Sequence, residues 1–466
     1  MIVIIGGGIS GLSVAWFLQS KGIPVRVLEK GAQPGGTIAT SYQNNFRVEH
    51  GPNSTLQKPG HPDDALGRLI HGIGLEPHLQ VANPLANRRY ILRDGVLRPL
   101  PASPPAFFFS SFFSWKAKGQ LLLEPFRARA SEEESIAAFV RRRLGAEFLD
   151  YVVEPFISGV YAGDPERLSV RAAVAKIYAL EQTHGSLIRG ALQQGRLLKG
   201  AGLPKGRMIS FTEGMGMLPA TIARQLPPGT LRTRFRVMSM TPSPQKHWQI
   251  YGVDHTGKTE KMLAKAVVLA VPAATAAQLL APFAGTAART LQAIPYAPIA
   301  SIALGYQRSR VGHPLDGFGF LVPRREQRPL LGALFSSTLF PERAAIDQVL
   351  LTAFIGGMTN PNILEQTDQT LIQQVETDLA QCVQSTIPAD FVYLTRYSAA
   401  IPQYTLGHLE RVAQVEADLA RFPGIYLRAN WRGGVSVADC VRNGEEVAEQ
   451  IVAHYPTLFG GSTPKK

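Results

Sequence analysis

The chain has 466 residues, of which 45% are hydrophobic and 18% charged, and its formal net charge is +13. This length predicts two or three domains, and the balanced composition excludes a disordered or fibrous chain. The excess of basic residues favours contact with anions, such as a lipid surface, a nucleic acid or a polycarboxylate substrate.

The number and spacing of the cysteine and histidine residues exclude a disulfide-rich protein and a metal-binding protein of the usual motifs. Cys382 and Cys440 cannot form a disulfide framework, and neither they nor the ten histidines show metal-ligand spacing, so we expect no metal. The sequence opens without a signal-like segment, and no apolar run reaches the roughly 20 residues of a membrane-spanning helix. We therefore expect a cytoplasmic protein that is neither secreted nor membrane-spanning.

The N-terminal sequence predicts a strand, a glycine-rich turn, a helix and a second strand. Apolar runs at Ile2–Ile5 and Val25–Leu28 are typical of buried parallel strands, and apolar residues at helical spacing lie between them until Gly22. This order is the βαβ unit of dinucleotide-binding proteins.

The glycines of this turn have the spacing that a pyrophosphate requires. Gly6 permits the tight turn, Gly8 lets the backbone approach the phosphates, and Gly11 lets helix and strand pack closely. Ile9 and Ser10 begin the helix, whose free N–H groups face an anion. Glu29, followed by Lys30, ends the second strand where an acid accepts hydrogen bonds from a ribose diol. An acid here disfavours NADP and leaves FAD or NAD.

Two further segments favour FAD over NAD. The segment KGAQPGGTIAT after Glu29 resembles the second glycine motif of FAD proteins of the glutathione-reductase and amine-oxidase type, with Gly35, Gly36 and Thr37 at the cofactor. Near the C-terminus, a strand at Ile425–Leu427, a glycine-rich turn and a helix predict a return of the chain to its cofactor.

Longer motifs carry a resemblance to one family. They are GGGISGLS (6–13), EHGPNS (49–54), EPFISGVYAGDPERLSVRAA (154–173), EGMGMLP (213–219), LDGFGFLVPR (315–324), LGALFSS (331–337), IPQYTLGHLE (401–410) and GGVSVADCVRNG (433–444). Together they resemble the protoporphyrinogen oxidase family, which includes the bacterial coproporphyrinogen oxidases. Two departures put the flavin geometry in doubt: Thr37 stands where the family has a basic residue, and Arg428 and Ala429 precede Asn430 where it has Ala-Gly, so positive φ is lost if it is needed.

The resemblance implies an α/β (α+β overall) fold in three parts. A Rossmann-type FAD-binding domain comprises residues 1–84, 205–285 and 415–466, a helical membrane-associated excursion residues 85–204, and a mixed-sheet substrate domain residues 286–414. Local patterns agree: Ser131 and Glu134 can form a capping box before a helix that ends at Gly145, and strand patterns lie at 235–240, 247–253 and 266–272.

The resemblance also implies a porphyrinogen substrate, oxidised to the porphyrin with oxygen or a quinone as acceptor. Arg89 is expected to bind a propionate, with Arg88 as the alternative; Leu334 and Phe335 are expected at the macrocycle face, and Gly163 beside them. Asn53 is a candidate catalytic residue, or a turn residue, and His50 adjoins it. The remaining expected FAD contacts are Gly51, Pro52, Asn53, Val237, Asn430, Val435, Ser436 and Val437.

An aromatic segment inside the helical excursion predicts a peripheral membrane contact. It contains Phe107, Phe108, Phe109, Phe112, Phe113 and Trp115, with basic residues after it. The alternative is an internal helix packed on the substrate domain. A non-turnover flavin protein and an amine or carotenoid oxidase are the rival functions; scattered basic residues disfavour nucleic-acid binding, and a homodimer stays open. The sequence leaves protoporphyrinogen and coproporphyrinogen unresolved.

Overall fold

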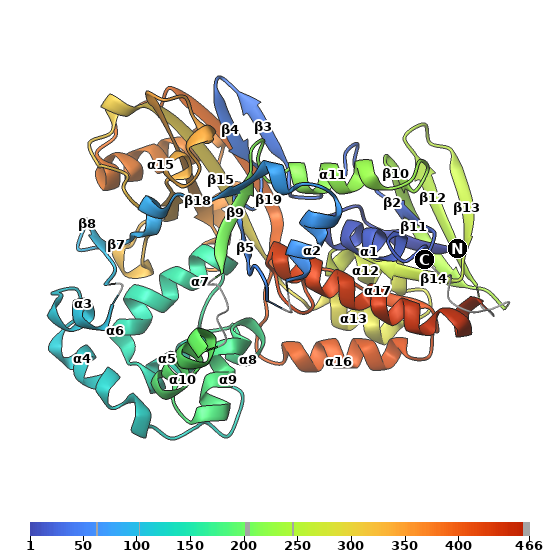
Figure 1. Ribbon diagram of the computed structural model, residues 1–466, viewed down its shortest axis with the longest axis horizontal. Coiled ribbons are helices and arrows are strands. Elements are labelled where there is room, and N and C mark those ends of the chain that lie inside the picture. The colour runs from blue at the N-terminus through green and yellow to red at the C-terminus, as the bar shows by residue number, and fades with distance from the viewer. Residues whose placement is uncertain (62–63, 102, 201–205, 245–246, 460–466) are drawn as a thin grey trace.

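The computed structural model describes residues 1–61, 64–101, 103–200, 206–244 and 247–459. Figure 1 shows a parallel sheet with helices on both faces on the right, a large mixed sheet at the upper left, and a group of helices at the lower left. The chain enters and leaves through the parallel-sheet part, so its two ends lie in one domain.

The parallel sheet is assembled from three separate stretches of the chain. Its order is β10 (Leu231–Arg232), β2 (Val25–Leu28), β1 (Ile2–Ile5), β14 (Ala266–Leu269) and β20 (Ile425–Leu427). Ile2 lies opposite both Val25 and Ala266, with all pairings parallel. Both chain ends and a middle segment contribute strands to this sheet, and β1, β2 and β20 have the limits expected from the sequence.

Both faces of this sheet are buried, which explains the continuous apolar sequence of β1. Ile2 and Ile4 face one layer, and Val3 and Ile5 face the other. The first layer contains α1 (Ile9–Gln19), α2 (Ala65–Gly72), α11 (Met217–Gln225) and α17 (Val437–Phe459). The second contains β11 (Phe235–Pro242), β12 (Trp248–Asp254), β13 (Thr259–Ala264), α12 (Ala273–Leu280), α13 (Gly285–Gln292) and α16 (His408–Leu419). The expected domain limits at 285/286 and 414/415 therefore fall inside α13 and α16.

The mixed sheet has seven strands. Their order is β19 (Phe391–Pro402), β15 (Tyr296–Gln307), β18 (Gln348–Gly356), β17 (Leu330–Leu334), β16 (Gly319–Leu321), β7 (Arg89–Arg93) and β8 (Val96–Pro99). The long helix α15 (Asp368–Val383) covers the core on one face, and α14 (Ser336–Leu339) follows β17. Residues 89–99, which the sequence places in the helical excursion, instead form two strands here because β7 pairs with β16.

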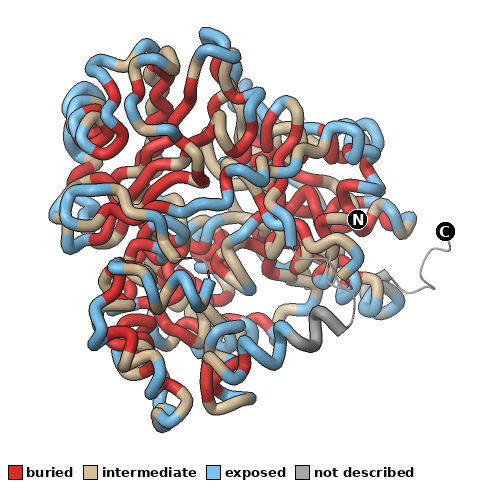
Figure 2. The backbone as a smooth tube through the Cα atoms, turned by 60° about the vertical axis from the view of Figure 1, so that its left-hand side comes forward, coloured by how far each residue is buried: buried red, intermediate tan, exposed pale blue. Residues whose placement is uncertain are grey.

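The helical part has its own core. Its helices are α3 (Pro104–Phe109), α4 (Trp115–Leu122), α5 (Ile136–Arg143), α6 (Ala146–Phe148), α7 (Glu154–Tyr161), α8 (Val170–Ala173), α9 (Ala175–His184) and α10 (Leu187–Gly200). Figure 2 shows buried segments running through this part, where Ile136, Phe139 and Ile157 pack together. The expected boundary at 204/205 lies outside the described residues.

The N-cap of α5 lies four residues later than expected. Ser135, not Ser131, caps it by accepting a hydrogen bond from the backbone N–H of Ala138 (3.1 Å). Glu134 is not part of a capping box, because its carboxylate pairs with Arg142. The local spacing was ambiguous because several serine and glutamate residues precede this helix.

Smaller strands complete the fold. β3 (Thr40–Gln43) pairs with β4 (Phe46–Glu49), and β9 (Arg207–Phe211) lies between β5 (Thr55–Gln57) and β6 (Leu79–Val81). Phe46 and Val48 of β4 pack against the mixed sheet at Ala303 and Leu350. The segment between the first glycine motifs and the mixed sheet therefore joins the two domains.

Candidate flavin and substrate site

The first glycine turn has the geometry that its spacing predicts. Gly6 has φ +108°, and a Cβ there would lie 2.3 Å from the carbonyl oxygen of Ala270. A Cβ on Gly11 would lie 2.0 Å from the Gly6 carbonyl oxygen, whereas one on Gly8 would meet no atom within 4 Å. Gly6 and Gly11 thus make close backbone packing, and Gly8 opens onto space at the start of α1, where a pyrophosphate fits.

The carboxylate of Glu29 is held rigidly at the end of β2. One oxygen accepts a hydrogen bond from the backbone N–H of Gly7 (2.7 Å), and the other accepts one from Gly31 (2.6 Å). Each carboxylate oxygen can accept a second bond, so the pair of oxygens can still receive a ribose diol. Lys30, next in the chain, is exposed.

The second glycine pair lies against the first turn. Gly35 donates its N–H to the Gly7 carbonyl oxygen (2.8 Å), and a Cβ on Gly36 would lie 3.5 Å from the Gly8 Cα. A Cβ on Gly51 would lie 2.3 Å from the carbonyl oxygen of Thr37, whose own side chain is exposed. The structure therefore brings three expected cofactor segments together around Gly8.

The side chain of Asn53 supports its own turn. Its amide donates to the carbonyl oxygen of Gly51 (3.3 Å), as expected of a turn residue after Pro52. His50 contacts the Ser41 hydroxyl through Nε2 (2.7 Å) and packs beside Tyr393, and burial lowers its pKa. A catalytic role for Asn53 stays a prediction.

The C-terminal turn returns to the first loop, as the sequence predicts. α17 packs along α1, and a Cβ on Gly444 would lie 2.8 Å from the Ser13 Cβ. The turn that precedes α17 contains Asn430, Val435 and Ser436, and Val437 begins the helix. Val237 lies on β11, opposite Gly252 of β12, and is partly buried.

The departure from the family pattern at Ala429 causes no backbone strain. Ala429 is not among the residues with positive φ, and the positive φ of this turn falls on Gly433 (+78°) and Gly434 (+121°). The concern that alanine removes a needed conformation is therefore wrong.

Sequence reasoning missed two side chains that hold this turn from the mixed-sheet side. The Tyr404 hydroxyl donates to the Asn430 carbonyl oxygen (2.6 Å) and accepts from the Gly434 N–H (2.9 Å). His408 bonds the Trp431 carbonyl oxygen through Nε2 (2.9 Å) and stacks on Tyr404 at 4.2 Å. Burial raises the pKa of Tyr404 and lowers the pKa of His408 to about 4. Both residues lie in the motif IPQYTLGH, which at the level of the sequence served only as evidence of the family resemblance.

Two of the expected substrate residues share a row on the mixed sheet. Gly319 of β16 lies opposite Arg89 on one side and Leu334 on the other, so both side chains point to one face across a glycine. Arg89 is exposed, with its guanidinium 5.4 Å from the ring centre of Phe318. In the described part of the chain it forms no ion pair, whereas Arg88 pairs with Asp316.

Phe335 takes a different place from the expected one. It follows the last residue of β17, has no exposed surface, and packs near Tyr90, His313 and Phe320. The expected contact of Phe335 with the macrocycle is therefore corrected to a core role.

Gly163 is also a packing residue in this structure. A Cβ there would lie 2.7 Å from both Gln403 Oε1 and Leu168 Cδ1. Gln403 in turn donates its amide to the carbonyl oxygen of Tyr161 (2.8 Å). The loop that contains Gly163 is thus joined to the segment that carries Tyr404.

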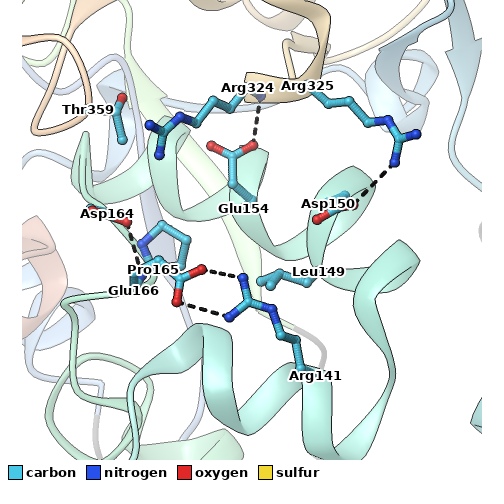
Figure 3. A pocket seen from close by; sticks show the side chains of 10 residues that line it. All are labelled: Arg141, Leu149, Asp150, Glu154, Asp164, Pro165, Glu166, Arg324, Arg325 and Thr359. Carbon is cyan, nitrogen blue, oxygen red and sulfur yellow. Dashed lines mark hydrogen bonds and ion pairs between the residues drawn. The ribbon is translucent and has the colours of Figure 1, made fainter.

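A separate charged pocket of about 380 Å³ lies between the helical part and the mixed sheet. Figure 3 shows its side chains: Arg141 pairs with Glu166, Arg325 with Asp150, and the Arg324 N–H donates to Glu154 (3.0 Å). Burial raises the pKa of Glu154. Its charged groups are largely paired with one another, and none of the expected FAD contacts lines it.

These features define a dinucleotide-binding oxidoreductase whose chain returns to its first glycine turn at its C-terminal end. The model of the family described as flavin containing amine oxidoreductase matches residues 9–452, and the chain belongs to this family. FAD is therefore its cofactor, and the open space at Gly8 fits that dinucleotide.

Several proteins with named activities are similar to this chain over nearly its whole length. The chloroplastic protoporphyrinogen oxidase of Oryza sativa subsp. japonica is 35% identical, over 96% of this chain and 87% of the relative. The coproporphyrinogen III oxidase of Bacillus subtilis is 26% identical, over 97% of this chain and 98% of the relative. A candidate protoporphyrinogen oxidase from Exiguobacterium sp. 255-15 with a known crystal structure is 26% identical in sequence. Its structure superposes with a TM-score of 0.81 over 97% of this chain and 98% of that protein.

Proposed function

We propose that this FAD-dependent oxidoreductase oxidises a porphyrinogen to the porphyrin, with protoporphyrinogen IX as the favoured substrate in tetrapyrrole biosynthesis. The observation that carries the proposal is the row of Arg89, Gly319 and Leu334. It presents a cation that forms no ion pair among the described residues, and an apolar side chain, on either side of a glycine without a side chain. A porphyrinogen has the same combination of propionate and apolar face. The higher identity to the rice protoporphyrinogen oxidase than to the Bacillus coproporphyrinogen oxidase supports the choice of substrate.

FAD, when bound, would accept two electrons from a carbon atom of the substrate. The chain supplies binding and orientation. Gly8 and the N-terminus of α1 receive the pyrophosphate, Glu29 receives the ribose, and the turn before α17 meets the flavin, with Gly35, Gly36, Thr37 and Gly51 beside them. Arg89 binds one propionate with its planar guanidinium and so sets which face of the macrocycle turns to the cofactor.

The test is aerobic turnover of the purified holoenzyme with each porphyrinogen, followed by porphyrin fluorescence. We expect protoporphyrinogen to give the larger kcat/KM. A larger value with coproporphyrinogen, which carries more propionates, would reverse the choice, and fully bound FAD without turnover of either would support a non-turnover flavin protein. Oxygen uptake against quinone reduction in the same assay identifies the acceptor.

We further propose a peripheral lipid contact through the exposed part of the aromatic segment. Phe109 and Trp115 are 92% and 79% exposed, and Phe126, which follows α4, is 79% exposed. Phe112 and Phe113 are instead buried against Ile91 and Tyr151, so the alternative of internal packing holds for these two. Within the described residues, no helix is long and apolar enough to cross a membrane. Interfacial binding would rest on such exposed aromatics beside cations.

Vesicles of anionic lipid test this contact. Each aromatic that enters the interface contributes on the order of 1.5–3 kcal/mol of apolar transfer, so replacing Phe109 and Trp115 by Ser should release most of the protein. Tyr42→Ser, which alters another exposed aromatic (65%) on β3, is the matched control. Equal retention of all three proteins would exclude this surface. Light scattering of the same proteins without vesicles measures whether a homodimer forms.

A further inference from the structure

Arg428 is a fully buried arginine in the turn that leads to α17. Its guanidinium donates to the carbonyl oxygens of Arg432 (2.8 Å) and Ala429 (3.0 Å) in the turn. Longer bonds of 3.4 Å reach the carbonyl oxygens of Asp439 and Cys440 in the first turns of α17. One side chain therefore ties the end of β20, the turn and the start of the helix together.

The positive charge of Arg428 has no carboxylate partner in the described residues. Asp439 on α17 bonds the Ser436 hydroxyl (2.6 Å) and Arg442 (3.3 Å), and Glu446, whose charge acts on Arg428, is likewise paired with Arg442. An arginine side chain keeps its proton in proteins, and a buried charge that only neutral dipoles solvate is costly. Some other negative group is needed to offset it.

The place of Arg428 in the fold indicates which group this is. α17 packs along α1, and the Cys440 thiol adjoins the Ser10 side chain in the first turn of α1. The open space at Gly8 lies at the same end of α1, where the doubly charged pyrophosphate of FAD fits. In the part of the chain that the structure describes, no carboxylate forms an ion pair with Arg428, and Glu446 acts on it only from a distance while paired with Arg442. The cofactor carries the charge that such a pair would supply.

We propose that Arg428 is a positioning residue for FAD: it fixes the turn from Ala429 to Val437 in its binding geometry, and its buried charge is offset by the bound cofactor. The inference depends on FAD binding and not on the identity of the substrate. A fixed cation behind this turn also favours the more negative, reduced form of the flavin, because an opposite charge nearby stabilises a developing charge.

The experiment compares Arg428→Met, which has similar length and no charge, with Arg428→Lys and with the matched control Arg432→Met. Arg432 stands in the same turn, but its side chain pairs with Glu416 on the surface. FAD affinity is measured by fluorescence quenching on apoprotein, melting temperature with and without FAD, and the flavin midpoint potential by spectroelectrochemistry. None of these needs a porphyrinogen.

Arg428→Met removes the charge-assisted hydrogen bonds that hold the turn. We therefore expect this variant to bind FAD about tenfold to a hundredfold more weakly. The rise in melting temperature on FAD binding should shrink, because that rise follows the affinity, and the midpoint potential should fall. Arg428→Lys should keep a potential close to that of the unaltered protein but bind FAD more weakly, since it lacks the planar fork. Arg432→Met should match the unaltered protein.

A purely structural role gives a different result. Apoprotein and holoenzyme would then lose equal stability, with unchanged FAD affinity and potential, and this outcome would overturn the proposal. If Arg428→Met does not fold, Arg428→Lys decides: unaltered FAD affinity in a folded Lys variant contradicts the proposal, and weakened affinity supports it.

Discussion

Substitutions at Gly8 and Gly11 of the first glycine turn should affect different properties: one FAD binding, the other the stability of the apoprotein. The same methyl group, added as Gly8→Ala or as Gly11→Ala, would meet very different surroundings. At Gly8 it would have no neighbour within 4 Å, and the backbone there has φ −72° and ψ 175°, which alanine adopts without strain. At Gly11 it would lie 2.0 Å from the Gly6 carbonyl oxygen.

The expected magnitudes follow from these contacts. For Gly8→Ala the apoprotein should lose less than about 1 kcal/mol of unfolding free energy, the cost of alanine at a helix N-cap. The methyl occupies space that the pyrophosphate needs, and losing one or two charge-assisted bonds of about 1.5–3 kcal/mol each weakens FAD binding by about tenfold to ten-thousandfold. For Gly11→Ala the overpacking cost of about 1–3 kcal/mol or more falls on the apoprotein.

The assay is urea unfolding of both apoproteins together with FAD titration. Gly8→Ala should show a normal unfolding midpoint and poor FAD binding, while Gly11→Ala should show a lowered midpoint before any FAD is added. The reasoning is refuted if Gly8→Ala purifies with a full complement of FAD, because the open space at Gly8 would then not be the pyrophosphate site.

Three further predictions concern single side chains. Arg89→Ala should lower kcat/KM for the porphyrinogen by about tenfold to a hundredfold with unchanged FAD content, whereas Arg88→Ala, which loses its contacts with Asp316 and Tyr90, should not; the reverse result would move the propionate site by one residue. Tyr404→Phe should weaken FAD binding and cost about 1–3 kcal/mol of stability, because two backbone groups of the turn lose their partner; an unaltered FAD titration would contradict this. The pKa of His408 is lowered to about 4 in the folded state, so the unfolded chain alone takes up a proton as pH falls through 6.5. Stability should therefore drop by about 1.5 kcal/mol between pH 6.5 and 5, and His408→Gln should show a flatter dependence in the same unfolding assay.

The parts of the fold that the sequence predicts well are those whose signal is local. β1, β2 and β20 have the predicted limits because each is a short apolar run between turn residues. Gly6 and Gly11 have the predicted packing, since their spacing matches one backbone geometry. The predicted position of Glu29 at the end of a strand likewise depends on few neighbours.

The parts that could not be predicted depend on pairing between distant segments. Strand β7 belongs to the mixed sheet only because Arg89 meets Gly319, more than two hundred residues later. Phe335 and Leu334 are neighbours in the chain, but Leu334 ends β17 opposite Gly319, whereas Phe335 begins the turn into α14 and lies in the core. The local sequence does not show where the strand ends, so an apolar pair by itself cannot identify the substrate contact.

The segment after β19 links the Gly163 loop to the turn before α17. Gln403 holds the carbonyl oxygen of Tyr161 beside Gly163, and the next residue, Tyr404, bonds both ends of the flavin turn. Because these adjacent residues share one backbone, a displacement of the Gly163 loop must either be absorbed within Gln403 or move Tyr404 against the turn. The turn is also tied from its other side by Arg428, so the least strained outcome is that the loop and the turn keep a fixed separation. That separation then depends on the hydrogen bonds of Gln403, Tyr404 and Arg428.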